Sequence, residues 1–342
     1  MKKSIAIILA LLMILSLASL AACGDKKAET TAPEGTETEA GSTADVDTQT
    51  VAVGAVVIAR DDVAEDEIYA FVSTIFDNAD AIAEQHGKGA ELDIEFASSV
   101  TGVPYHPGAA KYFEEKGHPV DAVKEGAGTG EAASLQFGTG GESGTYYAFG
   151  GVLASYVSNN TDYSITAVTS GGSQANIEDM TAGDVQLGFV QSDVMSYAYN
   201  GERLFDTPVE GFSVVAALYM EQVQIATTDS SIKSVADLAG KKVSIGAAGS
   251  GVYFNAIDVL GAYGLTEDDI SPVFQSFGDS AESLKDGKID AAFVVAGAPT
   301  TAITDLATAG PVYLVSLDAD HVDALLAASP FYSAYTIPAG TY

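Results

Sequence analysis

Short runs of β-branched and apolar residues alternate with amphipathic stretches along most of the chain. In its first half, strands are predicted at 134–138, 163–168 and 185–190. Loops of small residues follow these strands and lead into helices predicted at 145–157, at 174–181 and from 191 onward. Three successive strand–loop–helix units predict a parallel sheet with right-handed crossovers.

The same alternation continues in the second half of the chain. Strands are predicted at 243–246, 273–276, 289–295 and 312–317, and helices at 231–242, 252–263, 280–286 and from 297 onward. In open α/β sheets, ligands bind at the carboxyl ends of the strands, where the loops lie. The sequence therefore predicts the α/β fold class, with two α/β domains. A ligand cleft is expected between their loop rims, the edges of the two domains that are formed by the loops at the carboxyl ends of the strands.

The first 49 residues have a different pattern, typical of a targeting signal and a spacer. Lys2 and Lys3 precede an apolar stretch at 5–17 that is too short for a stable membrane span. The sequence Leu20-Ala21-Ala22-Cys23 resembles a bacterial lipobox, although an ordinary signal peptide that happens to contain a cysteine remains an alternative. We expect a signal peptide at 1–22, lipidation at Cys23 and a flexible tether at 23–49, because residues 24–49 are nearly devoid of large apolar side chains. The protein is then anchored by lipid to the outer face of the cytoplasmic membrane.

Composition and charge exclude several classes of function. The formal net charge is −32, and the only arginines are Arg60 and Arg203, so the chain lacks the basic footprint that nucleic-acid binding requires. Asp61 and Asp62 directly follow Arg60, which favours a surface ion pair over a ligand clamp. The sequence contains no P-loop, and its four histidines lack the spacing of metal ligands. We expect no cofactor, no metal and no catalysis.

Six motifs give the chain a recognisable family resemblance. In chain order they lie at 138–147, 169–173, 189–193, 249–255, 286–293 and 336–342, and they include Thr169-Ser170-Gly171-Gly172-Ser173 and Ile337-Pro338-Ala339-Gly340-Thr341-Tyr342. From about Ser134 to Tyr342 the sequence resembles the TAXI family, the solute receptors of TRAP transporters. The resemblance implies a type II periplasmic-binding-protein fold, TRAP membrane subunits as partners and a small anionic solute. It also implies that this solute is glutamate, a related amino acid or a dicarboxylate. We also expect the protein to be a monomer.

The order of the segments departs from the family. Residues 50–60 and 103–112 resemble the part of the family that follows the Ile-Pro-Ala-Gly-Thr-Tyr motif, yet here they come first. The sequence therefore looks circularly permuted, with residues 120–131 as the linker that joins the usual ends. In this fold two strands cross between the domains. We expect residues 50–60 and 216–227 to form these strands, because both are long apolar runs with β-branched residues. We expect these strands to be adjacent, Tyr342 to lie near Val46, and the domains to span 50–222 and 223–342.

The candidate ligand-binding residues lie on the two loop rims, where backbone amides and helix N-termini can hold a carboxylate. Tyr147 and the turn glycines have equally plausible roles in packing and turns. The candidates are Thr139, Gly140, Gly141, Tyr147, Ser170, Gly172, Ser173, Gln191, Ser192, Gly249, Ser250, Gly251, Tyr253, Asn255, Ala296, Gly297 and Pro299.

Three functions remain open at this point. The first is a receptor for a TRAP transporter. The second is a binding protein for an ABC importer or a sensor kinase. The third is an enzyme on the same scaffold, which the absence of a recognisable base, nucleophile or metal set disfavours.

Overall fold

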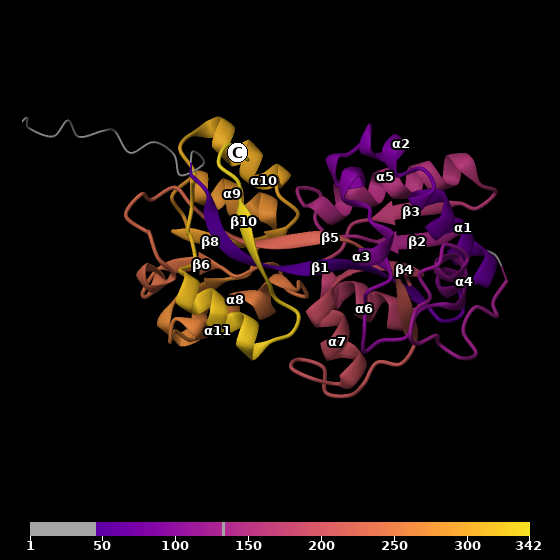
Figure 1. Cartoon of the computed structure of the whole chain (residues 1–342). Helices are drawn as coiled ribbons and strands as arrows, with labels where there is room; N and C mark the ends of the chain where they lie inside the picture. Colours follow the sequence, from indigo (N-terminus) through magenta and orange to yellow (C-terminus); the bar gives the residue numbers. More distant parts are fainter. Residues whose placement is uncertain (1–45, 132–133) are drawn as a thin grey trace, which may run out of the picture. The chain divides into compact units, whose positions relative to one another are not determined.

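The computed structural model describes residues 46–131 and 134–342 (Figure 1). The expected signal peptide, Cys23 and the expected tether as far as residue 45 lie outside the described residues. The first strand begins at Thr48, so Thr48 and Gln49 belong to the fold and not to the tether. Within the described residues, no helix is long and apolar enough to cross a membrane.

The described residues form two α/β lobes that share one sheet. The first lobe contains α1 (Glu65–Phe76), α2 (Ala79–Ala83), η2 (Gly87–Glu91), α3 (Ile94–Ala97), α4 (Pro107–Glu115), β2 (Leu135–Gly138), α5 (Thr145–Asn160), β3 (Ile165–Val168), α6 (Ser173–Ala182), β4 (Leu187–Gln191) and α7 (Ser192–Asn200). The second lobe contains η3 (Val235–Leu238), β6 (Lys242–Ser244), α8 (Val252–Ala262), η4 (Glu267–Asp269), β7 (Ser271–Val273), α9 (Phe277–Lys285), β8 (Ala291–Ala296), α10 (Thr301–Ala309), β9 (Tyr313–Leu314), α11 (Ala319–Ala328) and β10 (Ser333–Ile337). Two long strands, β1 (Thr48–Arg60) and β5 (Phe212–Thr227), belong to both lobes.

The two lobes repeat one strand arrangement. The sheet order is β3-β2-β4-β1-β5-β8-β6-β7, so three strands of each lobe flank the central pair. In the first lobe β2 is parallel to β3 and β4, and in the second β6 is parallel to β7 and β8. The predicted α/β fold class, with two lobes built from strand–loop–helix units, is confirmed.

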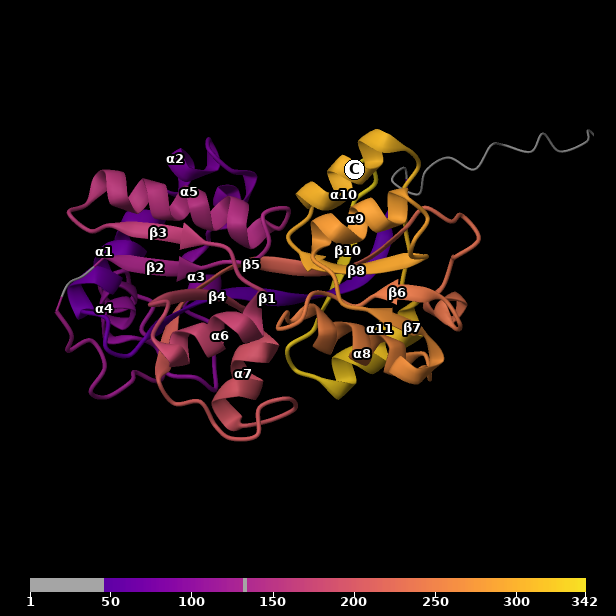
Figure 2. The same cartoon turned by 180° about the vertical axis from the view of Figure 1, so that it is seen from behind.

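The strands β1 and β5 cross between the lobes side by side, as Figures 1 and 2 show. They pair antiparallel from Ala52 opposite Gln222 to Arg60 opposite Phe212. At its far end β1 pairs with β4 of the first lobe, and β5 pairs with β8 of the second lobe. The predicted adjacency of these two apolar runs is confirmed.

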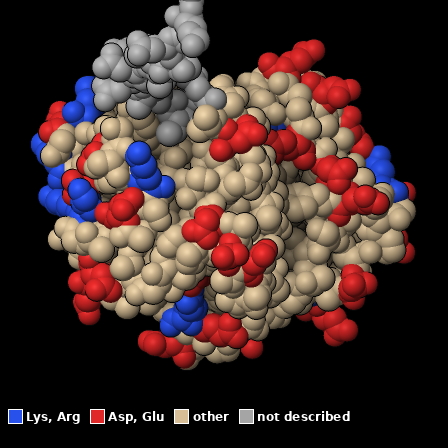
Figure 3. All heavy atoms as spheres, turned by 60° about the vertical axis from the view of Figure 1, so that its left-hand side comes forward, with Lys and Arg blue, Asp and Glu red and all other residues tan. Residues whose placement is uncertain are grey.

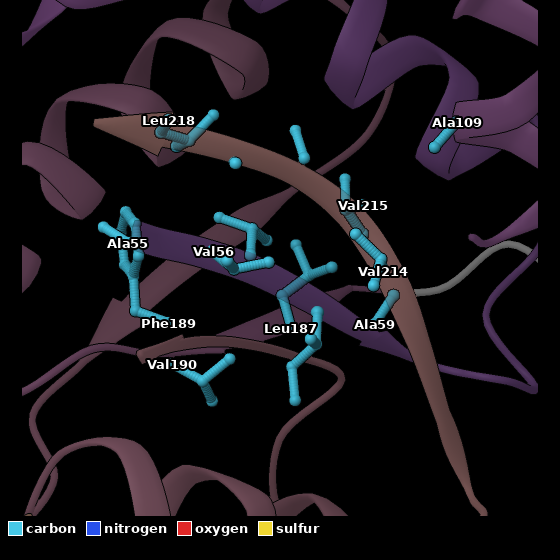
Figure 4. Packing of buried hydrophobic residues seen from close by; sticks show 14 of the residues in the cluster. Ala55, Val56, Ala59, Ala109, Leu187, Phe189, Val190, Val214, Val215 and Leu218 are labelled. Carbon is cyan, nitrogen blue, oxygen red and sulfur yellow. The ribbon is translucent and has the colours of Figure 1, made fainter. Parts of the chain in front are cut away.

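Burial on both faces explains why β1 carries only apolar residues and one glycine from Val51 to Ala59. In the first lobe, Ala55 and Val56 pack beside Phe189, Val190 and Leu218 in one hydrophobic core (Figure 4). The N-terminal part of β1 belongs instead to the core of the second lobe, where Val51 and Val53 pack with Val223 and Ile225. β1 therefore contributes to the hydrophobic cores of both lobes.

The start of the fold lies beside its C-terminal segment. Thr48 of β1 pairs with Ile337 of β10, and the Ala339 N–H donates a hydrogen bond to the Asp47 carboxylate at 2.9 Å. The segment 120–131 contains no helix, and Gly128 exchanges backbone hydrogen bonds with Asp61 and Glu65. The permutation hypothesis requires this closeness of the two ends, and the permutation itself stays a prediction.

Several predicted boundaries in the second lobe were wrong. The strand expected at 273–276 is β7, which ends at Val273, and the helix expected from 280 is α9, which begins at Phe277. The reason is an N-cap, because the Ser276 hydroxyl accepts a hydrogen bond from the Asp279 N–H at 3.1 Å. The helix expected at 231–242 is the single 3₁₀ turn η3, with a capping box of Ser234 and Asp237. The strand expected at 312–317 is reduced to the two residues of β9.

Acidic side chains are distributed over the face of the molecule shown in Figure 3, among neutral residues, and do not gather in one patch. Arg60, which the sequence assigned to a surface ion pair, pairs with Asp62 at 2.5 Å. This pair lies outside the cavity described below.

Candidate functional site

A cavity of about 370 Å³ lies between the two lobes. The residues that line it come from the loops at the starts of α5 and α6 in the first lobe and of α8 and α9 in the second, together with the ends of β4 and β8 and the middle of β5. Its size suits a small organic solute. The arrangement matches the predicted cleft between two loop rims.

The ends of four helices meet at this cavity. Gly144, Gly172 and Gly251 occupy the N-cap positions of α5, α6 and α8, and none of these three helices has a side-chain cap. Ser276 caps α9 with its own hydroxyl. A helix N-terminus without a side-chain cap leaves N–H groups of its first turn for other acceptors and presents the positive end of the helix dipole. On α6 one of these groups, the Ala175 N–H, is taken by the Gly249 carbonyl at 2.9 Å. Helix N-termini of this kind can bind an anion.

Two glycines allow the lobes to approach closely here. A side chain at Gly251 would overlap the Gln191 amide oxygen, and it would come within 3.0 Å of the Ser173 hydroxyl. Gly172 has a φ of 111°, a conformation that residues with a side chain rarely adopt. Glycine at both positions brings the starts of α6 and α8 together across the cavity.

Some polar atoms of the lining residues have no partner in the described part of the chain. The Ser250 hydroxyl and the Gln191 amide oxygen are buried without a hydrogen bond. The Ser173 hydroxyl, by contrast, accepts a hydrogen bond from the Gln191 N–H at 3.1 Å. Buried polar atoms without partners are costly, so these two are suited to bind a polar solute.

A buried acid lies on the same wall. Glu221, in the crossing strand β5, lines the cavity and is 2% exposed. The Tyr146 hydroxyl of α5 donates a hydrogen bond to its carboxyl group at 2.7 Å. Burial raises the pKa of the Glu221 carboxyl to about 8.

The structure brings about half of the predicted site residues together. Those that line the cavity are Gly140, Gly141, Ser170, Gly172, Ser173, Gln191, Ser250, Gly251 and Ala296. The predicted residues outside the lining are Thr139, Tyr147, Ser192, Gly249, Tyr253, Asn255, Gly297 and Pro299.

Two of the residues outside the lining join the lobes at the edge of the cavity. The Gly297 carbonyl accepts a hydrogen bond from the Thr145 hydroxyl at 2.9 Å. The Gly249 carbonyl accepts one from the Ala175 N–H, also at 2.9 Å. Both bonds connect the first lobe to the second, so these glycines hold the lobes together instead of facing the cavity.

Three of the other side chains outside the lining form hydrogen bonds with residues that do not line the cavity. The Thr139 hydroxyl donates to the Val168 carbonyl at 2.7 Å, the Ser192 hydroxyl accepts from the Gly54 N–H at 3.1 Å, and the Tyr253 hydroxyl donates to Glu267 at 3.1 Å. Tyr147 is half-buried on α5, and Pro299 is exposed.

Asn255 belongs to a separate network between α7 and α8. Its amide nitrogen donates to the buried Asp193 carboxylate at 3.0 Å and to the Tyr332 hydroxyl at 2.9 Å. Tyr332 in turn donates to Asp258, which pairs with Arg203 from the first lobe. Burial raises the pKa of Asp193 to about 7. This network joins the lobes away from the cavity.

Sequence reasoning missed several lining residues, among them Glu221, Tyr146 and those at the start of α9. Glu221 lies inside an apolar run that reads only as a strand, and Tyr146 lies at core spacing on its helix. The start of α9 was hidden by the wrong boundary described above. The lining residues that were not predicted are Glu142, Ser143, Gly144, Thr145, Tyr146, Gly171, Glu221, Ala247, Val252, Ser276, Phe277, Gly278, Asp279 and Val295.

In residues 46–131 and 134–342, no group of three or more His, Cys, Asp or Glu side chains is arranged to hold a metal ion.

Comparison with known proteins gives one family match. Residues 16–117 and 137–342 match the NMT1-like family. The unmatched residues 118–136 include the segment 120–131, which was predicted to be the linker of a permuted chain.

Three solved structures are similar to part of the chain. The alkanesulfonate-binding protein SsuA from Xanthomonas axonopodis pv. citri is 22% identical with a TM-score of 0.38, over 54% of this chain and 61% of that one. A putative L-cystine ABC transporter protein from Listeria monocytogenes is 18% identical with a TM-score of 0.38, over 58% and 90%. A TRAP solute-binding protein from Rhodoferax ferrireducens T118, in complex with benzoate, is 16% identical with a TM-score of 0.32, over 58% and 74%. The chain thus spans less than two thirds of the SsuA protein, and similarities of this extent do not identify a solute.

Proposed function

Since the chain belongs to the NMT1-like family, whose members are periplasmic solute-binding proteins, we propose that it is an extracytoplasmic receptor of the TAXI kind. It captures a small acidic solute, either a glutamate-like amino acid or a dicarboxylate, and delivers it to a TRAP-type transporter. Closure of the two lobes around the solute presents the loaded receptor to the membrane subunits. The receptor acts as a monomer on a lipid anchor at Cys23.

The convergence of helix N-termini on one cavity is the observation that carries this proposal. The starts of α6 and α8 approach each other from opposite lobes, with Ser173 and Ser250 at their ends. A carboxylate between them would receive hydrogen bonds from both lobes, so its binding would favour the closed arrangement. The lining residues carry no lysine or arginine, so the helix ends supply the positive potential.

Bulky substitutions at these two positions test the site. Replacing Ser173 or Ser250 with leucine fills the space between the helix ends, so binding of L-glutamate, L-aspartate, succinate and 2-oxoglutarate should be lost. The matched control is Ser155→Leu, at an exposed position on α5. Thermal unfolding establishes that each variant is folded, and calorimetric titration measures the affinity. Unchanged affinity in both cavity variants would refute the assignment of the site.

The transporter class is tested by uptake into proteoliposomes that contain the membrane subunits encoded beside the receptor. A TRAP system takes up the solute in response to an ion gradient, without ATP. Uptake that depends on ATP would assign the receptor to an ABC importer instead.

The anchor is tested separately with Cys23→Ala. This variant should leave the membrane fraction or stay unprocessed, because the acylated thiol is gone. Continued lipid labelling of the variant would contradict the lipobox assignment.

A further inference from the structure

Glu221 occupies an unexpected place for an acid in a site that attracts anions. It lies on β5, in the part of the strand that crosses between the lobes, and it pairs with Val53 of β1. Its carboxyl group accepts the Tyr146 hydroxyl at 2.7 Å and faces the cavity that the helix ends surround. An acid that served only to complete a protein core would be expected to have a cationic partner.

The groups around Glu221 provide no such partner within the described residues. Tyr146 of α5 and Tyr219 of β5 are neutral, and Asp193 of α7 is a second buried acid. Lys88 of η2 is the cation whose field reaches Glu221, but its ammonium group is paired with Glu91 at 2.5 Å. At the cavity lining, the remaining titratable groups are two exposed carboxylates, Glu142 and Asp279. The pKa of Glu221, raised to about 8 by burial, therefore keeps its carboxyl neutral at pH 7 in the empty cavity.

The carboxyl group lies next to the part of the cavity that attracts anions. The Tyr146 hydroxyl that binds Glu221 is also within hydrogen-bonding reach of the Ser173 side chain, at the start of α6. One tyrosine hydroxyl thus separates the acid from a helix N-terminus. This spacing suits a solute whose cationic and anionic groups are close neighbours, as in an α-amino acid.

We propose that the solute carries an ammonium group beside its carboxylate, that Glu221 binds this ammonium group, and that the Glu221 carboxyl releases its proton to water as the solute binds. This inference rests on the proposed function, because it concerns the same cavity and chooses the amino acid over the dicarboxylate. The ammonium group keeps its proton, and the O–H bond of Glu221 is the bond that breaks. Charge-assisted hydrogen bonds between ammonium and carboxylate are stronger than those of a neutral acid, and this difference favours ionisation.

Calorimetric titration of the full-length chain with matched pairs of solutes tests the inference. The pairs are L-glutamate with glutarate, L-aspartate with succinate, and L-alanine with propionate, so that each pair differs by the amine. Titrations at pH 7 in phosphate and in Tris, whose ionisation enthalpies differ, give the number of protons released. For the amino acid that binds, we expect about one proton per solute, since a group with a pKa of about 8 is mostly protonated at pH 7. Its amine-free partner should bind about tenfold or more weakly, without proton release.

The variant Glu221→Gln separates recognition from structure. Glutamine retains the size and the acceptor for Tyr146 but has no proton to release. Its affinity for the amino acid should fall about tenfold or more, while its weak affinity for the amine-free partner should stay unchanged. Glu114→Gln, the same change at an exposed position on α4, should behave like the natural chain.

The outcomes distinguish this inference from the proposed function. If a dicarboxylate binds as tightly as its amino acid, or if an amino acid binds without proton release, the receptor function stands and the role of Glu221 is refuted. If none of the six solutes binds, both are refuted. If Glu221→Gln binds the amino acid unchanged, the inference is also refuted.

Discussion

The Thr145 hydroxyl donates a hydrogen bond to the Gly297 carbonyl at 2.9 Å, and this bond joins the two lobes beside the cavity. Two backbone hydrogen bonds do the same, from Ala175 to Gly249 and from Ala302 to Ser143, at 2.9 and 3.2 Å. Thr145 also begins α5, one of the helices whose N-terminus faces the cavity. Contact between the lobes and the geometry of the site are thus controlled by the same residues.

We predict that Thr145→Val favours a more open arrangement of the lobes. Valine has nearly the shape of threonine but cannot donate to Gly297, so the closed form should lose about 1 kcal/mol. Small-angle X-ray scattering should then show a larger radius of gyration without solute, and the affinity for solute should fall about fivefold. Thr308→Val, at an exposed position on α10, is the control. Equal radii and affinities in the two variants would contradict a role for Thr145 in closure.

We predict that Ser250→Ala weakens solute binding without destabilising the empty protein. The Ser250 hydroxyl is buried and has no partner in the described residues, so its removal should leave the melting temperature unchanged or slightly higher. A solute carboxylate would lose one hydrogen bond, which corresponds to about a tenfold loss of affinity. Thermal unfolding and titration of the same samples measure both effects. A lower melting temperature with unchanged affinity would mean that Ser250 is structural.

We predict that the stability of the empty protein falls as the pH rises from about 6.5 to 8. Below this window the buried His106 acts in the opposite direction, because burial lowers its pKa to about 4 and the unfolded chain then holds a proton that the native state lacks. Burial raises the pKa of Glu221 from 4.5 to about 8 and that of Asp193 from 3.8 to about 7. Across this window the native state holds protons that the unfolded chain has lost, so the free energy of unfolding decreases with pH, by up to about 1.4 kcal/mol per pH unit for each group. Urea unfolding at several pH values should therefore give a smaller decrease for Glu221→Gln than for Glu114→Gln. Equal decreases would show that Glu221 is not protonated in the native state.

We also predict that the chain folds with its segments in the usual family order. The rearranged chain begins at residue 134 and continues from Tyr342 directly into residues 46–131, a join made short by the hydrogen bond between Asp47 and Ala339. It should bind the same solute as the natural order. Both crossing strands would then be continuous in sequence with the lobes on either side. Its unfolding should therefore be at least as cooperative as that of the natural chain. A rearranged chain that fails to fold or to bind would argue against the permutation.

The sequence predicted the scaffold better than the chemistry of the site. The apolar runs at 50–60 and 216–227 could be read as strands, since burial on both faces leaves little room for polar residues. The rims around Ser173 and Ser250 could be found because small residues before a helix are a local signal. Glu221 could not be assigned to the site, because the face of a crossing strand that meets the cavity is decided by how two lobes close. Asn255 and Gly297 were predicted to bind the solute, but the structure places them in contacts between the lobes. Local sequence does not distinguish a residue that faces a cavity from one that faces the other lobe.

The most direct test of the receptor account is thermal unfolding of the full-length chain in the presence of acidic amino acids and dicarboxylates, followed by chemical analysis of the recovered solute. The account predicts that at least one of these solutes raises the melting temperature in proportion to the logarithm of its concentration, binds once per chain and is recovered unchanged. A panel that leaves the melting temperature unaltered, or a solute that is converted on incubation, would contradict it.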